Sequence, residues 1–405
     1  MIKEEITQTV EAINRVFSRG HYPAYIEYIR FPFFKNLKPD SRINFDFPFT
    51  VLTGLNGSGK SSALHAIYGS PEGYSTGQYW FSTDLDPIRD EKGNPPAFIY
   101  GYKGNNGDTL EVLKTRVGSS KGADYWEPSR PIKRYGMSKI SGGRRNPAIS
   151  KQVIYLDFRA ELSAFDKFFY FGNFIPKKTL KTKQDYLRRY TRNVKFALDC
   201  DCVTTMNSRS NSLPNTLNET VVRDIATILG KPYDECKLVD HNFYAVQGST
   251  ILFQTSNAKY SEAFAGRGEY AVVKLVHKIY EAPHGALIIL DEPEVSLHPG
   301  AQELLKLFLL KKCLEKKLQI VISSHAPKLV EWLPEGAIKL FYQENDGKFS
   351  IKNNCSYFEA FENIGIEIND GSKKTIILED ITAKEIVDAV INDIGRDFPL
   401  LLATK

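Results

Sequence analysis

Residues 49–64 read FTVLTGLNGSGKSSAL, which is a short apolar strand, a glycine-rich turn and the start of a helix. Gly54 to Ser61 match the phosphate-binding loop pattern, in the strand-to-helix context that the pattern requires. The glycines let backbone N–H groups turn inward around a phosphate, and the helix N-terminus behind them favours anions. The stretch therefore predicts an ATP site, with Lys60 on the β- and γ-phosphates and the Ser61 hydroxyl on Mg²⁺. The residues expected to line the phosphates are Asn56, Gly57, Ser58, Gly59, Lys60, Ser61 and Ser62.

Composition places the chain among globular proteins. Its 405 residues are 42% hydrophobic and 12% aromatic, enough for one large core or a few domains. The net charge of +5 is too small to imply a polyanion partner by itself. Of the five cysteines, Cys200 and Cys202 lack a second pair at metal-binding spacing, so reduced structural thiols are expected rather than zinc or disulfides. A charged N-terminus and no long apolar run predict a cytoplasmic protein without a membrane span.

Apolar periodicity predicts the elements around the loop. A helix is expected over 4–17, two strands lead into the loop, and a mostly β segment is inserted over 74–146 before the next buried strand. The expected strands are 24–31, 43–47, 97–102, 109–117 and 151–158. Further on, a helix over 219–229 and a hairpin of 243–247 with 250–254 are expected.

Residues 175–195 form the most basic stretch of the chain, with a single acid, Asp185, and two interleaved tyrosines, Tyr186 and Tyr190. A solvated helix face is one interpretation. The other is a surface that contacts a DNA backbone without reading its sequence. Its basic residues are Lys177, Lys178, Lys181, Lys183, Arg188, Arg189, Arg192 and Lys195.

Two later strands end in polar residues suited to nucleotide chemistry. Residues 286–292, ALIILDE, read as a buried parallel strand whose terminal acids point into the ligand crevice of an α/β sheet. Asp291 is expected to hold the Mg²⁺ hydration shell, and Glu292 to polarise the water that attacks the γ-phosphate. His325 follows a third strand, 319–324, and is expected to contact the γ-phosphate, although a lone histidine is more often structural.

These residues resemble a known family. LDEPEVSLHP at 290–299 and SSHAP at 323–327 look like the ABC-type ATPases, in the branch shared by SMC-like DNA-repair ATPases and the overcoming-lysogenization-defect (OLD) nucleases. The resemblance implies an α/β ABC-type P-loop ATPase head with a mixed sheet and inserted β-rich and helical segments. It also implies that 296–298 form the D-loop and that His325 is the switch histidine. A transporter ATPase is disfavoured by the same motifs and by the long inserts.

The family's signature motif should open a helix before the Walker B strand. Here Phe264 to Glu269 read FAGRGE, ahead of an expected helix over 270–280. Ala265 replaces the family's serine, while Gly266 and Gly268 could still offer N–H groups and Arg267 a charge. A plain glycine-rich helix cap is the alternative. For the Q-loop glutamine, Gln152 is the nearest candidate.

The resemblance implies an assembly and a function. Two heads would sandwich ATP in a homodimer or a higher even oligomer, and slow ATP hydrolysis would gate DNA processing in phage defence or DNA repair. The alternatives are an ATPase subunit that controls a separate effector, as in Septu-like systems with an HNH-nuclease partner, and a nucleotide clamp without significant hydrolysis.

The C-terminal stretch is similar to the opening of a Toprim domain. A strand over 375–378, Glu379, a helix over 382–394 and a strand over 398–402 follow one another. Glu379 would be one of several metal-binding acids, and since one carboxylate cannot hold the metal, residues 1–405 alone are expected to lack nuclease activity. We expect the natural chain to continue past Lys405 with the missing acids. A degenerate Toprim and an ordinary β-α-β cap are the alternatives.

These features predict two domains. The ATPase domain is expected over 1–345, with inserts at about 72–150 and 175–250. The Toprim-like element is expected over 346–405.

Overall fold

The computed structural model describes residues 2–90, 94–104, 107–118, 125–138, 145–363, 365, 374–378, 381–394 and 400–404. The chain divides into two compact units, 1–357 and 358–405, which are considered separately. The domain boundary predicted at 345 stays a prediction.

A six-stranded sheet forms the centre of the first unit. Its order is β17-β16-β3-β15-β14-β7, with β17 antiparallel and the other strands parallel. Every residue of β3, β14 and β15 is buried, as expected for parallel strands covered on both faces. The mixed α/β sheet predicted from the sequence is confirmed. Its strands are β3 (Phe49–Gly54), β7 (Val153–Asp157), β14 (Leu287–Asp291), β15 (Gln319–Ser323), β16 (Ile338–Gln343) and β17 (Phe349–Lys352).

The strand register brings the polar strand ends together. Asp291 pairs with Ser323 on one side and with Asp157 on the other, and Ser323 pairs with Leu52 near the end of β3. Since all four strands run in the same direction, their carboxyl ends lie at one edge of the sheet. The phosphate-binding loop leaves β3 at that edge.

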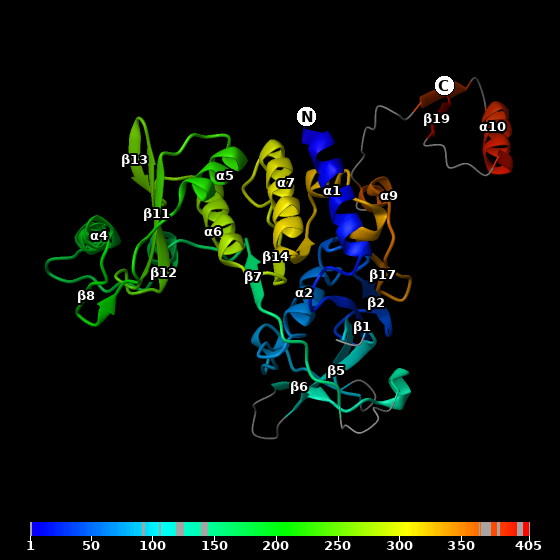
Figure 1. Ribbon diagram of the computed structural model, residues 1–405, viewed down its shortest axis with the longest axis horizontal. Helices are drawn as coiled ribbons and strands as arrows, with labels where there is room; N and C mark the ends of the chain where they lie inside the picture. The colour runs from blue at the N-terminus through cyan, green and yellow to red at the C-terminus, as the bar shows by residue number, and fades with distance from the viewer. Residues whose placement is uncertain are drawn as a thin grey trace. The chain divides into compact units, whose positions relative to one another are not determined.

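Helices flank this sheet. The helix after the loop, α2, contacts β14 and β15, while α1 contacts α7, and α7 also contacts α5. Figure 1 shows α5, α6 and α7 as neighbours. The predicted helices at 4–17, 219–229 and 270–280 are confirmed. Helices of this unit include α1 (Ile2–Ser18), α2 (Lys60–Tyr68), α5 (Glu219–Leu229), α6 (Arg267–Glu281), α7 (Pro299–Lys316) and α8 (Pro327–Val330), while α9 (Tyr357–Glu362) starts at the last residue of the unit.

A second, antiparallel sheet has the order β2-β1-β4-β5-β6. The strands of the inserted segment, β4 to β6, continue the sheet that begins with the first hairpin, because β1 pairs with both β2 and β4. Its strands are β1 (Ile26–Phe33), β2 (Ser41–Asn44), β4 (Ala97–Lys103), β5 (Thr109–Val117) and β6 (Tyr125–Ser129). Single turns of 3-10 helix are η1 (Thr76–Gln78), η2 (Lys133–Tyr135) and η4 (Glu335–Ala337).

Residues 164–262, here called the arm, have a hydrophobic core of their own. Phe168, Leu187 and Val194 pack there against Val239 and Phe243. The arm sheet has the order β10-β11-β12-β13. Its elements are α3 (Ala164–Asp166), η3 (Lys167–Phe171), α4 (Lys183–Cys200), β8 (Thr205–Met206), β9 (Arg209–Ser210), β10 (Asn215–Thr216), β11 (Glu235–His241), β12 (Gly248–Thr255) and β13 (Ala258–Ser261).

One predicted arm strand is wrong. Residues 243–247 form the loop between β11 and β12, and the strand that pairs with β12 comes earlier, at 235–241. Ala245 has φ 62°, a left-handed backbone conformation that a strand cannot contain. The apolar residues in this loop, such as Phe243, face the arm core rather than a ladder partner.

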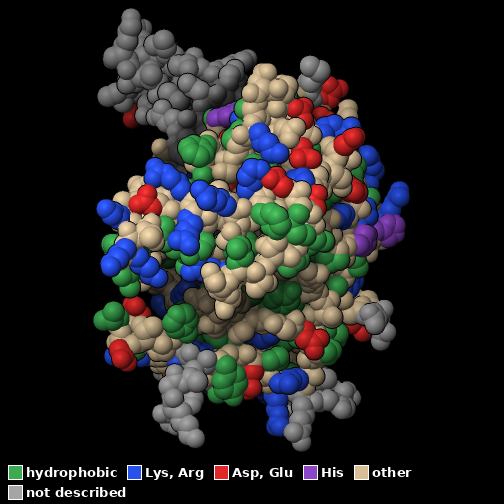
Figure 2. Space-filling model, turned by 90° about the vertical axis from the view of Figure 1, so that its left-hand side faces the viewer, with side chains coloured by type: hydrophobic (Ala, Val, Ile, Leu, Met, Phe, Trp, Pro, Cys, Tyr) green, Lys and Arg blue, Asp and Glu red, His purple; other side chains and the backbone are tan. Residues whose placement is uncertain are grey.

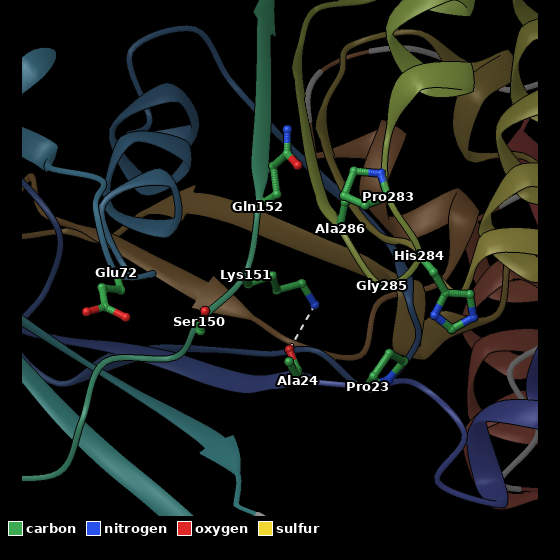
Figure 3. Close-up of a pocket in the computed structure, with 10 residues that line it drawn as sticks. All are labelled: Pro23, Ala24, Glu72, Ser150, Lys151, Gln152, Pro283, His284, Gly285 and Ala286. Carbon is green, nitrogen blue, oxygen red and sulfur yellow. Dashed lines mark hydrogen bonds between the residues drawn. The ribbon is translucent and has the colours of Figure 1, made fainter.

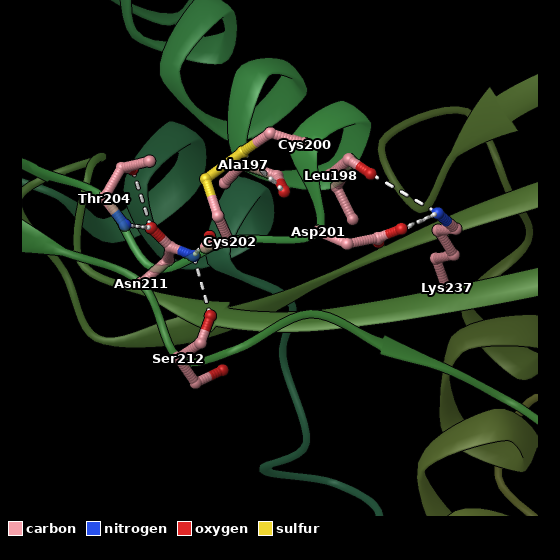
Figure 4. The surroundings of a disulfide bond; sticks show 9 residues. All are labelled: Ala197, Leu198, Cys200, Asp201, Cys202, Thr204, Asn211, Ser212 and Lys237. Carbon is pink, nitrogen blue, oxygen red and sulfur yellow. Dashed lines mark hydrogen bonds and ion pairs between the residues drawn. A yellow bond between two sulfur atoms is a disulfide. The ribbon is translucent and has the colours of Figure 1, made fainter.

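The expectation for the cysteines is partly wrong. Cys200 and Cys202 form a disulfide at the C-terminal end of α4, where Asp201 between them has φ 47° (Figure 4). That left-handed residue turns the chain back and brings the two sulfur atoms together. Its carboxylate accepts a hydrogen bond of 2.9 Å from Lys237 on β11. The remaining cysteines are buried thiols, as predicted: Cys236, Cys313 and Cys355.

The second unit contains the predicted β-α-β element. Its strands, β18 (Lys374–Leu378) and β19 (Leu400–Thr404), are parallel, and α10 (Ile381–Ile394) connects them. The proposed metal ligand Glu379 lies outside the described residues. No helix in the described part of the chain is long and apolar enough to cross a bilayer.

Candidate functional site

The phosphate-binding loop has the backbone conformation that its glycines predict. Gly57 and Gly59 have φ 75° and 99°, so both are left-handed, and α2 starts directly after Gly59. Asn56 is exposed, while Ser61 and Ser62 are half-buried at the start of α2. The Ser58 hydroxyl is buried and has no hydrogen-bond partner among the described residues. Such an unsatisfied group fits a loop that awaits an anionic ligand.

Lys60 is held inside this loop. Its side chain is buried, and Nζ donates hydrogen bonds of 2.9 Å each to the carbonyls of Gly54 and Leu55. Burial lowers the pKa of the Lys60 ammonium to about 8. The two carbonyls offer the ammonium only partial negative charges, whereas a bound phosphate would offer it a full one.

Asp291 is fully buried at the end of β14 and accepts four hydrogen bonds. Oδ1 accepts from the hydroxyls of Ser61, at 3.3 Å, and Ser323. Oδ2 accepts from Arg159 Nη2 at 2.7 Å and from the Tyr155 hydroxyl at 3.4 Å. Ser61 and Asp291 thus place a hydroxyl and a carboxylate side by side, the hard oxygen donors that Mg²⁺ prefers, so these residues fit the predicted cation.

Glu292 and His325 meet beside this carboxylate. Glu292 has φ 52°, and its backbone N–H donates to the Ser323 carbonyl at 3.1 Å. Its carboxylate lies 3.9 Å from His325 Nε2. Burial, with the nearby Lys60 charge, lowers the pKa of His325 to about 4, so the imidazole is neutral near pH 7. Nε2 has no hydrogen-bond partner among the described residues and remains able to bind a ligand.

Sequence reasoning missed Glu294, which positions this histidine. Glu294 Oε1 accepts hydrogen bonds from the His325 backbone N–H at 2.7 Å and from the Ser324 hydroxyl at 2.9 Å. Burial raises the pKa of its carboxyl group. The available signal was a third acid close after a buried strand. Acidic side chains are rarely buried unless they have a partner, so an acid at this place could have been examined for one.

Arg159 and Tyr155 were also missed. Both belong to β7 or the loop after it, and both contact Asp291. Their position at the end of a strand parallel to β14 could have identified them, since the carboxyl ends of such strands share one edge. The order of the strands, however, is not visible in the sequence.

The candidate signature segment packs against the candidate D-loop. A Cβ on Gly268 would lie 2.5 Å from the carbonyl oxygen of Ser296, so only glycine permits this close approach. Phe264, in contrast, is 86% exposed. Gly266 caps α6, and its N–H donates to Glu269 Oε2 at 2.8 Å. The helix-cap interpretation and the signature interpretation are therefore compatible.

Gln152 does not belong to the nucleotide site, so this candidate is wrong. It precedes β7 and lies at the edge of the sheet opposite to Asp291. There it lines a cavity of about 380 Å³ together with Lys151 (Figure 3). Lys151 Nζ donates to the Ala24 carbonyl at 2.9 Å, and burial lowers its pKa to about 7.

Part of the chain matches a known protein family. Residues 264–331 match the family described as "AAA domain, putative AbiEii toxin, Type IV TA system", a segment that runs from the signature candidate past Asp291 to α8. No curated protein matches the chain.

Several solved structures are also similar. An SMC head domain from Thermotoga maritima has a TM-score of 0.41 at 16% identity and covers 82% of this chain and 99% of its own. A second is an SMC head bound to the C-terminal winged-helix domain of ScpA, with a TM-score of 0.45, 16% identity and coverages of 81% and 97%. The third, from Pyrococcus furiosus, is an SMC head with an extended coiled coil bound to the C-terminal domain of ScpA. It has a TM-score of 0.47 at 15% identity and covers 84% of this chain and 98% of its own.

The phosphate-binding loop and the matched segment together support a P-loop ATPase.

Proposed function

We propose that the protein binds and hydrolyses ATP with Mg²⁺ and uses this cycle to gate DNA processing. The observation that carries the proposal is the convergence of Lys60, Ser61, Asp291, Glu292 and His325 at one edge of the central sheet. Lys60 would bind the phosphates, and Ser61 and Asp291 would hold the cation, whose charge would stabilise the charge that develops on the phosphoryl oxygens. Glu292 would accept the proton of the attacking water.

The first test removes the cation ligand. Asp291→Asn is expected to lower Mg²⁺-dependent phosphate release by about 10- to 100-fold, because the neutral amide is a weaker cation ligand. The measurement is steady-state phosphate release, with chelation of Mg²⁺ as a second arm. Asp234→Asn changes an exposed carboxylate between α5 and β11 and should retain full activity. Tight ATP binding by the wild type without phosphate release would instead favour the nucleotide clamp.

A homodimer or higher even assembly is part of this proposal. The exposed Phe264, with the exposed Gly266 and Arg267, leaves the signature segment available to a second copy. In the proposed assembly, Gly266, Arg267 and Gly268 of one subunit close over the ATP bound by another.

The arm supports contact with DNA. Most basic side chains of the 175–195 stretch are exposed. Figure 2, which views the molecule from the left-hand side of Figure 1, shows Lys and Arg side chains gathered on part of the surface facing the viewer. A shallow cavity of about 490 Å³ is lined by residues that include Arg188, Arg189 and Arg192. Arg188 pairs with Asp185 at 3.1 Å. The surplus of positive charge fits a phosphate backbone, and no base-reading element is required.

The double variant Arg189→Glu/Arg192→Glu tests this surface. We expect it to weaken binding to a random-sequence duplex and to reduce the slope of log affinity against log salt by about two, since each lost phosphate contact removes roughly one released counterion. Fluorescence anisotropy at several salt concentrations measures both. The control, Arg15→Glu/Arg223→Glu, makes the same charge change at exposed positions of α1 and α5. An equal loss in the control would contradict a specific surface and favour a solvated helix face.

The biological setting belongs to the proposal as well. The family description names a type IV toxin–antitoxin protein, which is compatible with a defence role for this chain. The parallel β18-α10-β19 element is compatible with the start of a Toprim domain, in which Glu379 would be one metal ligand. A separate effector nuclease controlled by this ATPase is the second candidate, and copurification of a nuclease subunit would favour it.

A further inference from the structure

The Arg159 side chain lies against three carboxylates at the proposed ATP site, those of Asp157, Asp291 and Glu292. Its guanidinium binds Asp157 through two hydrogen bonds, Nε at 3.0 Å and Nη2 at 3.1 Å. The same Nη2 donates to Asp291 Oδ2 at 2.7 Å, and Nη1 lies 3.8 Å from Glu292. One guanidinium thus contacts or approaches three carboxylates at the carboxyl edge of the sheet.

This arrangement conflicts with cation binding at Asp291. Both oxygens of the buried carboxylate are occupied, Oδ1 by Ser61 and Ser323 and Oδ2 by Arg159 and Tyr155. Three of these donors are neutral hydroxyls that can rotate, whereas the guanidinium carries a full charge and would repel Mg²⁺. A cation held between Ser61 and Oδ1 would therefore lie close to the guanidinium on Oδ2 and be repelled by it.

We propose that Arg159 is a displaceable counter-ion, which holds Asp291 while the site is free and leaves it when Mg²⁺ and nucleotide bind. The inference rests on the proposed ATP site. Arg159 suits this role because its side chain is 45% exposed, so solvent can receive the guanidinium when it leaves. Asp157, at the end of β7, would keep it close to the site.

The backbone around Arg159 connects this exchange with the arm. The Arg159 carbonyl accepts a hydrogen bond of 2.8 Å from Arg267 at the start of α6, and the Leu162 carbonyl accepts one of 3.4 Å from Tyr270. On the same helix, Lys274 donates to Ser249 on β12 at 2.8 Å. A shift of the loop that carries Arg159 would therefore act on α6 and on the arm sheet.

The test is nucleotide affinity in Arg159→Ala. We expect about tenfold tighter binding of a non-hydrolysable ATP analogue with Mg²⁺, because a charged hydrogen bond no longer has to be broken. Binding without Mg²⁺ should change much less. Isothermal titration calorimetry measures both, and circular dichroism checks the fold. Arg159→Lys retains the charge, so its nucleotide affinity should lie between those of the wild type and Arg159→Ala. Arg15→Ala, which removes an exposed arginine from α1, should leave both affinities unchanged.

Two results would overturn the inference. Equal affinity in Arg159→Ala and the wild type would show that no competition exists, and a loss of affinity both with and without Mg²⁺ would make Arg159 a phosphate ligand. If the wild type bound no nucleotide, the proposed function would fail and this inference with it.

Hydrogen exchange of the arm amides provides a second readout. The analogue with Mg²⁺ should change exchange in the wild type but not in Arg159→Ala, and an equal change in both would refute the connection to the arm.

Discussion

Glu292→Gln is expected to reduce ATP turnover by about 100-fold or more while ATP binding is retained, because an amide cannot accept the proton of the attacking water. Glutamine has the same size as glutamate, and the backbone N–H of residue 292 would keep its bond to the Ser323 carbonyl. The strained left-handed conformation at Glu292, φ 52°, is set by this backbone and not by the carboxylate. The variant should therefore fold normally and accumulate with ATP bound.

Single-turnover phosphate release and equilibrium binding together measure this effect. Sedimentation adds a second readout, since blocked hydrolysis should enrich the ATP-sandwiched dimer. Glu335→Gln, at an exposed site in η4, is the matched control and should behave as wild type. Full turnover in Glu292→Gln would refute its assignment as the base. A strict monomer under all nucleotide conditions would count against the assembly.

Lys60→Ala is expected to weaken ATP binding by about 10- to 100-fold, the loss typical of hydrogen bonds to charged groups. Lys60 lies in the loop, bonded to the carbonyls of Gly54 and Leu55, and its amine is the nearest charge for a phosphate there. Burial places the pKa of Lys60 at about 8 in the free protein, so its charge is present below that pH and is lost above it. Wild-type affinity should thus fall as the pH rises through about 8.

Calorimetric titrations below and above this pH test both statements. Lys60→Ala should lose the affinity and also this part of its pH dependence. Lys311→Ala removes an exposed lysine that pairs with Glu5 and should change neither. Unchanged affinity in Lys60→Ala would exclude the loop as the phosphate site.

The sequence alone determined the local chemistry of this protein. Residues 54–61 and 286–292 could be interpreted without a structure because they carry short-range signals, namely glycines with left-handed backbone and fully apolar strands that end in acids. The β-α-β element between residues 374 and 404 was also predicted by its periodicity.

Only the tertiary structure decided which of these elements meet. β15 lies between β3 and β14, and this order brings His325 to Glu292. The pairing of β7 with β14 places Arg159 on Asp291 and removes Gln152 from the site. A single left-handed residue, Asp201, brings Cys200 to Cys202. The physical reason is that strand pairing and buried ion contacts join residues far apart in the chain, whereas the patterns readable in a sequence extend over only a turn of helix or a strand.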